Sequence, residues 1–297
     1  MSSSTKILAG VFVLLAIAAY FLLPSGKERE VSYKPAEVNL SIDSASIVKI
    51  DLQHPGKSVT IENISGKWTI TSPIHYAANS STVAELISGL RKFKAGSLVS
   101  SNPEKQNLFQ VDTTGSKITL TDRSGKSTSL IVGKTGPSSS EVYFRLPDFK
   151  DVYLGEGLST WVINQDLKDW RDKTIFSTTS DSIKQLAFNY RKKNLVLRRD
   201  STTWKYGEDS IATNIMTSTL NTLSNLRADD FVDTLYQPKT RPFGIKIQSA
   251  GEVALNFFPQ PPDSSKYFVQ TSQSPQGFLL NKWTVQELLR PIEKFQK

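Results

Sequence analysis

The hydrophobic and polar positions divide this chain into a short apolar start and a long body of mixed patterns. The sequence ILAGVFVLLAIAAYFLL at residues 7–23 contains no charged residue. As a helix with a rise of 1.5 Å per residue, this run spans about 25 Å, close to the hydrocarbon thickness of a bilayer. We therefore expect a transmembrane anchor at 7–23, preceded by a cytoplasmic segment at 1–6 and followed by a tether at 24–37.

The charges that flank this anchor indicate its orientation. Lys6 precedes it, whereas the charges of the run Lys27–Glu30 after it are balanced. This bias favours an amino terminus in the cytoplasm, so we expect the body to be extracytoplasmic. The small residues of Ala16-Ile17-Ala18 leave a cleaved signal peptide open as an alternative.

Beyond the tether, alternating apolar and polar residues predict strands. Residues 46–52, 58–61 and 68–70 alternate, and turns that contain Gly56 and Gly66 separate them. This pattern is typical of a three-stranded antiparallel meander. It continues with strands expected at 117–121, 127–132, 142–145 and 152–154.

The period changes to that of a helix after the meander. Apolar residues then recur every three or four positions, at Val83, Leu86, Ile87, Leu90 and Phe93. Residues 79–81 are candidate caps, and Thr82 and Glu85 have the spacing of a capping box. We expect an amphipathic helix that covers one sheet face and a closing helix at 158–172. An antiparallel twisted sheet with helices on one side defines an α+β fold.

The body also repeats itself. Matching residues keep their order while the separation within each pair falls from 136 to 125: Trp68 with Trp204, Val83 with Met216, Leu108 with Leu235, Ile118 with Ile245, and Leu154 with Leu279. An ordered series of this kind indicates duplication, with shorter loops in the second copy. We therefore predict two tandem repeats, 38–175 and 176–297, with Trp68 and Trp204 in equivalent core positions.

Composition excludes several classes of site. Hydrophobic residues make up 38% of the chain and charged residues 22%, as in a folded protein. The chain has no cysteine and only two histidines, His54 and His75, which we interpret as solvated. A disulfide framework, a lipoprotein attachment site and a zinc site of ordinary composition therefore lack their ligands. We expect no metal and no cofactor.

The motifs that resemble catalytic or nucleotide-binding signatures are incomplete. Gly125-Lys126-Ser127 and Gly133-Lys134-Thr135 lack the earlier glycine and the following helix of a phosphate-binding loop, so we interpret both glycines as turn residues. Ser46 and Lys49 lie on opposite faces of a predicted strand. We interpret Asp229-Asp230 as the solvated end of a helix. No catalytic residue emerges.

The net charge of +8 is most concentrated at Arg191-Lys192-Lys193, which we place at a hairpin tip. Two interpretations stay open: contact with an anionic partner, or a solubilising turn. Nucleic acid is disfavoured, because the body is expected outside the cytoplasm and has no base-stacking signature.

Several segments resemble the bacterial family known as domain of unknown function 4340. They are Gly66-Lys67-Trp68, the helix at 83–93, Leu108-Phe109, the strands at 142–145 and 151–154, Trp170-Arg171-Asp172-Lys173, and the second Trp204 copy. The resemblance implies an anchored, duplicated protein of the bacterial inner membrane, with its body in the periplasm. It also implies genes placed beside ABC transporter components related to gliding-motility permeases, and it supplies no catalytic residues.

Three hypotheses about function follow. The first is a non-enzymatic accessory protein that binds an envelope component, such as an ABC transporter assembly. The second is a glycan- or anionic-lipid-binding module that uses Arg191, Lys192 and Lys193. The third is an envelope hydrolase, for which neither a nucleophile nor an acid pair is evident.

Overall fold

The computed structural model describes residues 43–233, 238, 240–260 and 265–295. The expected anchor at 7–23 and its tether lie outside these ranges, as does Leu235, the expected counterpart of Leu108. None of the helices in the described ranges is long and apolar enough to cross a bilayer.

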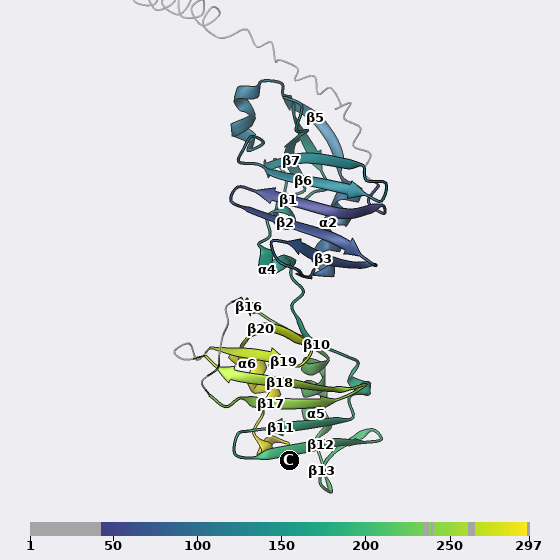
Figure 1. Cartoon of the computed structure of the whole chain (residues 1–297), viewed down its shortest axis with the longest axis vertical. Coiled ribbons are helices and arrows are strands. Elements are labelled where there is room, and N and C mark those ends of the chain that lie inside the picture. Colours follow the sequence, from purple (N-terminus) through teal and green to yellow (C-terminus); the bar gives the residue numbers. More distant parts are fainter. Residues whose placement is uncertain (1–42, 234–237, 239, 261–264, 296–297) are drawn as a thin grey trace, which may run out of the picture. The chain divides into compact units, whose positions relative to one another are not determined.

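The described chain forms two antiparallel sheets of nine strands each, together with a few helices (Figure 1). The α+β class is therefore as predicted. The first sheet contains β1 (Ile47–His54), β2 (Lys57–Ile64), β3 (Lys67–Ser72), β4 (Tyr76–Ala77), β5 (Lys94–Ser100), β6 (Ser116–Asp122), β7 (Ser127–Thr135), β8 (Glu141–Arg145) and β9 (Val152–Glu156). Its strand order is β4-β3-β2-β1-β6-β7-β8-β9-β5.

The second sheet contains β11 (Gln185–Asn189), β12 (Asn194–Asp200), β13 (Thr203–Tyr206), β14 (Asp209–Ser210), β16 (Asp230–Val232), β17 (Phe243–Gln248), β18 (Glu252–Pro259), β19 (Lys266–Thr271) and β20 (Ser274–Asn281). Its order is β14-β13-β12-β11-β17-β18-β19-β20-β16. A separate two-stranded sheet pairs β10 (Thr174–Ser177) with β15 (Asn225–Arg227).

The two large sheets have the same order once their strands are matched in sequence, which supports the predicted internal repeat. The pairing register agrees as well. Ile50 lies opposite Leu120 in the first sheet, and Leu186 lies opposite Ile247 in the second. These are the residues that the predicted separations of 136 and 127 bring into correspondence.

The expected meander and the later strands of the first sheet are all present. Six strands were not predicted from the sequence: β4 and β5 in the first sheet, β14 and β16 in the second, and the separate pair β10 and β15. β5 directly follows the long helix and pairs with β9 at the sheet edge. Its seven residues, KAGSLVS, include no buried side chain, so it carries no alternating apolar signal.

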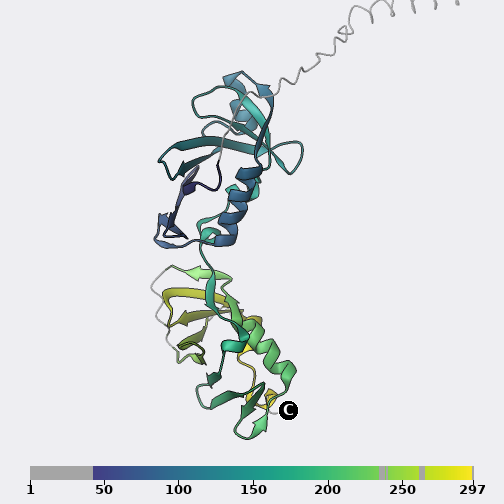
Figure 2. The same ribbon diagram turned by 90° about the vertical axis from the view of Figure 1, so that its right-hand side faces the viewer.

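One long helix accompanies each sheet: α2 (Ser80–Lys92) and α5 (Thr213–Ser224). In each case the helix lies along one sheet face (Figure 2). Val83, Leu86 and Leu90 are buried as expected. The predicted capping box of Thr82 and Glu85 is wrong. The cap of α2 is Asn79, whose Oδ1 accepts a hydrogen bond from the Ser81 N–H at 3.2 Å. Thr82 lies inside the helix, and its hydroxyl donates to the Asp169 carbonyl at 3.3 Å.

The closing helix predicted at 158–172 is two short helices, α3 (Thr160–Ile163) and α4 (Leu167–Trp170). Asn164 ends the first, and its side-chain oxygen accepts from the Ser116 hydroxyl at 3.1 Å. A polar side chain held by the sheet in this way interrupts the helix. The remaining helices are η1 (Pro103–Phe109), η2 (Ser180–Ser182), α6 (Lys282–Leu288) and η3 (Ile292–Lys294).

The described residues divide into two compact units, 43–60 with 84–164 and 61–83 with 165–295. In the second unit, the side chains of Leu186, Leu197 and Ile247 from the sheet form one apolar core with Met216 and Leu223 of α5. Trp204 belongs to this core and is 5% exposed, whereas Trp68 is only partly buried in the first sheet. The site described below lies entirely within the second unit.

Candidate functional site

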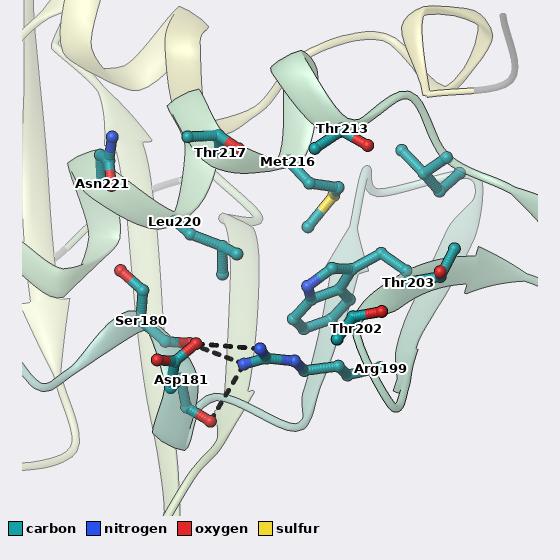
Figure 3. A pocket seen from close by; sticks show the side chains of 12 residues that line it. Ser180, Asp181, Arg199, Thr202, Thr203, Thr213, Met216, Thr217, Leu220 and Asn221 are labelled. Carbon is teal, nitrogen blue, oxygen red and sulfur yellow. Dashed lines mark hydrogen bonds and ion pairs between the residues drawn. The ribbon is translucent and has the colours of Figure 1, made fainter.

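A pocket of about 200 Å³ lies beside the first half of α5 in the second unit (Figure 3). Its walls come from three elements: η2, the β12–β13 hairpin and α5. Four buried residues form its apolar side: Trp204, Ile211, Met216 and Leu220.

The β12–β13 hairpin positions two of the lining residues. Its turn places Ser201 in the left-handed region with φ 57°, and Arg199 pairs directly opposite Trp204 in the ladder. Directly opposed residues of an antiparallel pair project from the same face of the sheet. The hairpin therefore brings a guanidinium group and an indole ring to one wall of the pocket.

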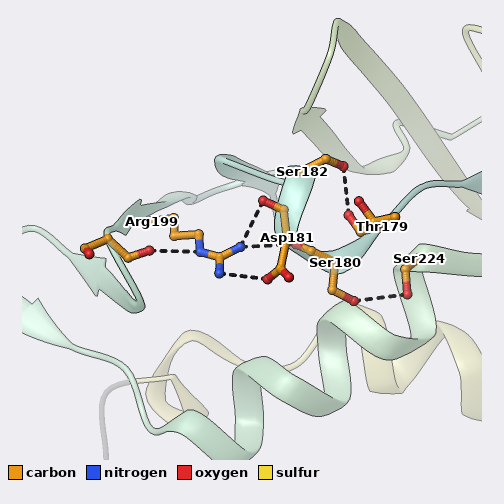
Figure 4. A network of polar contacts seen from close by, with 7 residues as sticks. Thr179, Ser180, Asp181, Ser182, Arg199 and Ser224 are labelled. Atoms are coloured by element: carbon orange, nitrogen blue, oxygen red, sulfur yellow. Dashed lines mark hydrogen bonds and ion pairs between the residues drawn. The ribbon is translucent and has the colours of Figure 1, made fainter.

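Arg199 is held by a dense set of bonds to η2 (Figure 4). Its Nη2 lies 2.9 Å from Asp181 Oδ1, and its Nη1 donates to the Asp181 carbonyl at 3.0 Å and the Ser180 carbonyl at 3.4 Å. Its Nε donates to the Ser201 carbonyl at 3.1 Å. Since Nε and Nη1 are both engaged and Nη2 is paired with a carboxylate, the arginine is fixed and locally neutralised.

The polar network continues from η2 to the end of α5. The Ser180 hydroxyl donates to the Ser224 hydroxyl at 3.3 Å, and the Ser182 hydroxyl donates to the Thr179 carbonyl at 2.8 Å (Figure 4). The Ser180–Ser224 bond fastens η2 to the end of α5, and the Ser182 bond closes the turn within the η2 segment, so the shape of the pocket is defined by the fold.

The other polar lining residues are neutral. They are Thr202, Thr203, Thr213, Thr217 and Asn221, all of which are exposed. Within the described part of the chain, their side chains form no hydrogen bond with another protein group. The pocket thus combines an apolar side with hydroxyl and amide groups that are available to a ligand.

The structure places the predicted basic cluster elsewhere in the second unit. Arg191, Lys192 and Lys193 are exposed in the turn between β11 and β12, which is the expected hairpin tip. The Arg191 guanidinium lies 4.2 Å from the centroid of the Phe243 ring. The preceding Tyr190 is partly buried, its hydroxyl donates to the Arg290 carbonyl at 2.5 Å, and burial raises its pKa well above the ordinary range.

The interpretation of Asp229-Asp230 as a helix end is wrong. α5 ends at Ser224, and Asp230 begins β16. Asp229 Oδ2 accepts from the Asn281 N–H at 2.6 Å, and Asp230 Oδ1 accepts from the Phe231 N–H at 2.9 Å. Both carboxylates therefore bond to backbone groups around the sheet edge, where β16 pairs with β20.

Two other sequence interpretations change. His54 is not a solvated turn residue: it ends β1, is partly buried, and its Nδ1 lies 2.7 Å from the Ser116 hydroxyl. Gly133 lies within β7 and not in a turn. The Phe109 carbonyl oxygen approaches this position too closely to admit a side chain, which explains the glycine. Among the residues with described placement, no group of three or more carboxylate or histidine side chains could hold a metal ion.

Sequence reasoning missed the pocket itself. Nothing in the local sequence marks Arg199 or Asp181 as a residue of a site. Their bond joins residues 18 positions apart, and the opposite wall comes from α5. The one signal in the sequence is the Arg199 to Trp204 spacing across a short hairpin, which predicts a cross-strand pair once the turn is located.

These observations define an α+β protein whose two large sheets share one strand order. The family described as domain of unknown function (DUF4340) matches residues 68–246, which is more than half of the chain. The chain belongs to this family. No curated protein and no solved structure matches it.

Proposed function

We propose that this protein is a membrane-anchored accessory protein of the bacterial envelope that works by binding and not by catalysis. Its partner is another envelope component, and an ABC transporter assembly is the candidate that the family resemblance suggests. One observation carries the proposal. In each sheet a short helix follows the strand that stands next to last in the strand order, and this helix exposes a tryptophan to solvent.

The two tryptophans occupy the same local position. Trp161 is the second residue of α3, which follows β9, and Trp283 is the second residue of α6, which follows the equivalent strand β20. Trp161 is 67% exposed and Trp283 is 80% exposed, the two highest values among the exposed large hydrophobic residues of the described chain.

The local fold explains why both indoles face outward. The Ser159 hydroxyl caps α3 and the Asn281 side chain caps α6, which fixes where each helix begins. The apolar residues that follow are buried: Val162 and Ile163 in α3, and Val285 in α6. The indole at the second position is therefore left on the solvent side in both places.

An exposed tryptophan has the properties of a binding residue. It can bury about 150–250 Å² on a partner while losing little conformational freedom, and tryptophan is enriched among residues that dominate interface energies. An exposed indole at the second position of a short helix in each copy supports a binding role. The two tryptophans are not aligned residues, because at the separation of 125 Trp161 falls on Gln286. The anchor expected at 7–23 would hold both indoles among membrane-associated components.

The test is quantitative co-purification of the tagged full chain from membranes in mild detergent. We expect a reproducible set of envelope proteins with the wild type and loss of most of that recovery with the Trp161→Ala/Trp283→Ala variant. Phe149→Ala is the matched control, because Phe149 is 58% exposed and lies in neither of the two short helices. Recovery of the bait alone, or equal recovery by all three proteins, would contradict the proposal.

The basic hairpin tip supports a second candidate function, the binding of anionic lipid or envelope glycan. Arg191, Lys192 and Lys193 are all exposed there, and the described residues offer no ion pair to any of the three. Three cations on one turn attract an anionic surface over roughly the Debye length, about 8 Å at physiological salt.

This candidate is tested by sedimentation of the body from residue 38 onward with vesicles that contain phosphatidylglycerol. We expect binding that falls as salt rises and that weakens in Lys192→Gln/Lys193→Gln, but not in the control Lys105→Gln/Lys126→Gln, which removes two exposed lysines elsewhere. Binding that is indifferent to salt, or equal in both variants, would exclude this role.

A further inference from the structure

The residues that frame the pocket beside α5 in the second copy differ from the aligned residues of the first copy. At the separations that align the two copies, Asn63 stands in place of Arg199 and Ala45 in place of Asp181. Asn63 has a different task, since its side-chain oxygen accepts from the Gly66 N–H and closes the β2–β3 turn. The ion pair that frames the pocket was therefore acquired or kept by one copy alone.

The start of the long helix differs in the same way. In the first copy, Asn79 caps α2. Its counterpart at the start of α5 is Ala212, which has no side-chain oxygen, and α5 has no side-chain cap. Thr213, the first residue of α5, lines the pocket. The uncapped N–H groups of this first turn thus end at the rim, where an oxygen atom of a ligand would satisfy them.

The lining chemistry selects against a small anion. Nε and both hydrogens of Nη1 of Arg199 are taken by carbonyls, and Nη2 is paired with Asp181. The Asp181 side chain is 91% exposed at the rim, where it repels negative charge. The guanidinium therefore shapes the wall and does not serve as a free anion-binding group.

What remains is an apolar side and neutral polar residues around a small volume. The apolar side contains Trp204 and Met216, and the polar side chains are those of Thr202, Thr213, Thr217 and Asn221, whereas Thr203 projects from the other face of β13. A hydroxylated ring matches both, because its C–H face packs on apolar side chains while its hydroxyls both donate and accept hydrogen bonds. A volume of about 200 Å³ suits one such ring and not a longer chain.

We propose that the pocket between α5, η2 and the β12–β13 hairpin binds one neutral sugar ring, either a free monosaccharide or the terminal unit of an envelope glycan. This goes beyond the partner-binding function proposed above and does not depend on it. The tryptophans of that proposal, Trp161 and Trp283, are not part of this pocket.

The test is saturation-transfer difference NMR and titration of the full chain in detergent with glucose and N-acetylglucosamine, and with inorganic phosphate as the anionic comparison. We expect saturable binding of at least one sugar and none of phosphate. In Thr213→Val/Thr217→Val, the hydroxyls of two lining residues are removed at nearly constant volume, and we expect affinity to fall about tenfold or more.

Thr222→Val is the matched control, because Thr222 lies on the same helix outside the pocket and its hydroxyl bonds to the Ser218 carbonyl. Melting temperatures of all variants establish that they are folded, and Thr217→Trp gives a second probe that obstructs the opening. Competition by a soluble oligosaccharide with the same terminal unit identifies a glycan, and its failure to compete identifies a free sugar. No saturable sugar binding, preferred phosphate binding, or equal loss in Thr222→Val would overturn the proposal.

Discussion

The two large sheets of this protein share their strand order and register, but they differ at the positions where each sheet meets its helix and its turns. Ile50 and Leu186 are equivalent residues with no exposed surface in either sheet. By contrast, His54, which ends β1, and its aligned counterpart Tyr190, which follows β11, have different partners, the Ser116 hydroxyl and the Arg290 carbonyl. The comparison teaches that the buried ladder was conserved between the copies while helix starts and turn tips were free to diverge.

The shared core gives the largest expected effect. Ile50→Ala and Leu186→Ala each remove a fully buried side chain, so we expect each to lower the free energy of unfolding by about 2–5 kcal/mol. Urea unfolding monitored by circular dichroism measures both. If one variant were as stable as the wild type while the other was not, the two ladders would not be equivalent in packing.

Substitutions at the two helix caps are expected to change stability by intermediate amounts and in opposite directions. Asn79→Ala removes the cap of α2 and is expected to cost about 1 kcal/mol, whereas Ala212→Asn supplies the missing cap of α5 and is expected to add a similar amount. Thermal unfolding should show melting temperatures that move in opposite directions. A shift of the same sign in both variants would contradict this account of the difference.

The partly buried Tyr190 beside the hairpin tip of the second copy should make the free energy of unfolding depend on alkaline pH. Burial raises the pKa of Tyr190 above its ordinary value of 10.0. The folded state therefore holds its proton more tightly than the unfolded state, and the associated stability is complete below pH 10 and is lost as pH rises further. We expect Tyr190→Phe to reduce this alkaline loss, as measured by urea unfolding at pH 8 and at pH 10.5. An unchanged pH dependence would count against the burial of this hydroxyl.

The smallest effect concerns a turn of the first sheet that the second does not reproduce. Asp122 accepts hydrogen bonds from the Ser124 hydroxyl at 2.6 Å and from the Lys126 N–H at 3.0 Å, and the Ser124 bond is the main cause of a lowered pKa at Asp122. Its aligned counterpart is Ser249. In Ser124→Ala we expect the pKa of Asp122 to rise toward its ordinary value with little change in melting temperature. Carboxyl NMR titration measures this, and an unmoved pKa would assign the shift to another group.

Much of the fold could be read from local patterns, and the errors have identifiable physical causes. Alternation gave the meander and the strands from Ser116 onward because each has one buried face. It missed β5, which has no buried side chain, and it joined α3 and α4 because the bond from Ser116 to Asn164 that separates them is not visible in the sequence. Asp229-Asp230 was misplaced because α5 ends earlier than its apolar pattern suggested.

The candidate site was far less predictable than the fold. A cluster of like charges, such as Arg191-Lys192-Lys193, is visible in one stretch of sequence, but its partners are not. The pocket is assembled from segments around residues 180, 200 and 215, and no single stretch contains more than part of it. Its most telling feature, the neutralised Arg199, depends on three bonds to Ser180 and Asp181 that exist only after η2 is fastened beside α5.

The sequence by itself determined the α+β class and the duplication, because hydrophobic periodicity is a local property of the chain. It also predicts an anchor at 7–23 from the length of the apolar run. Only the tertiary structure decided which polar groups are satisfied by the protein and which stay available to a ligand. It did so because hydrogen-bond satisfaction depends on residues distant in sequence meeting in space, as Arg199, Asp181 and α5 do in the second copy.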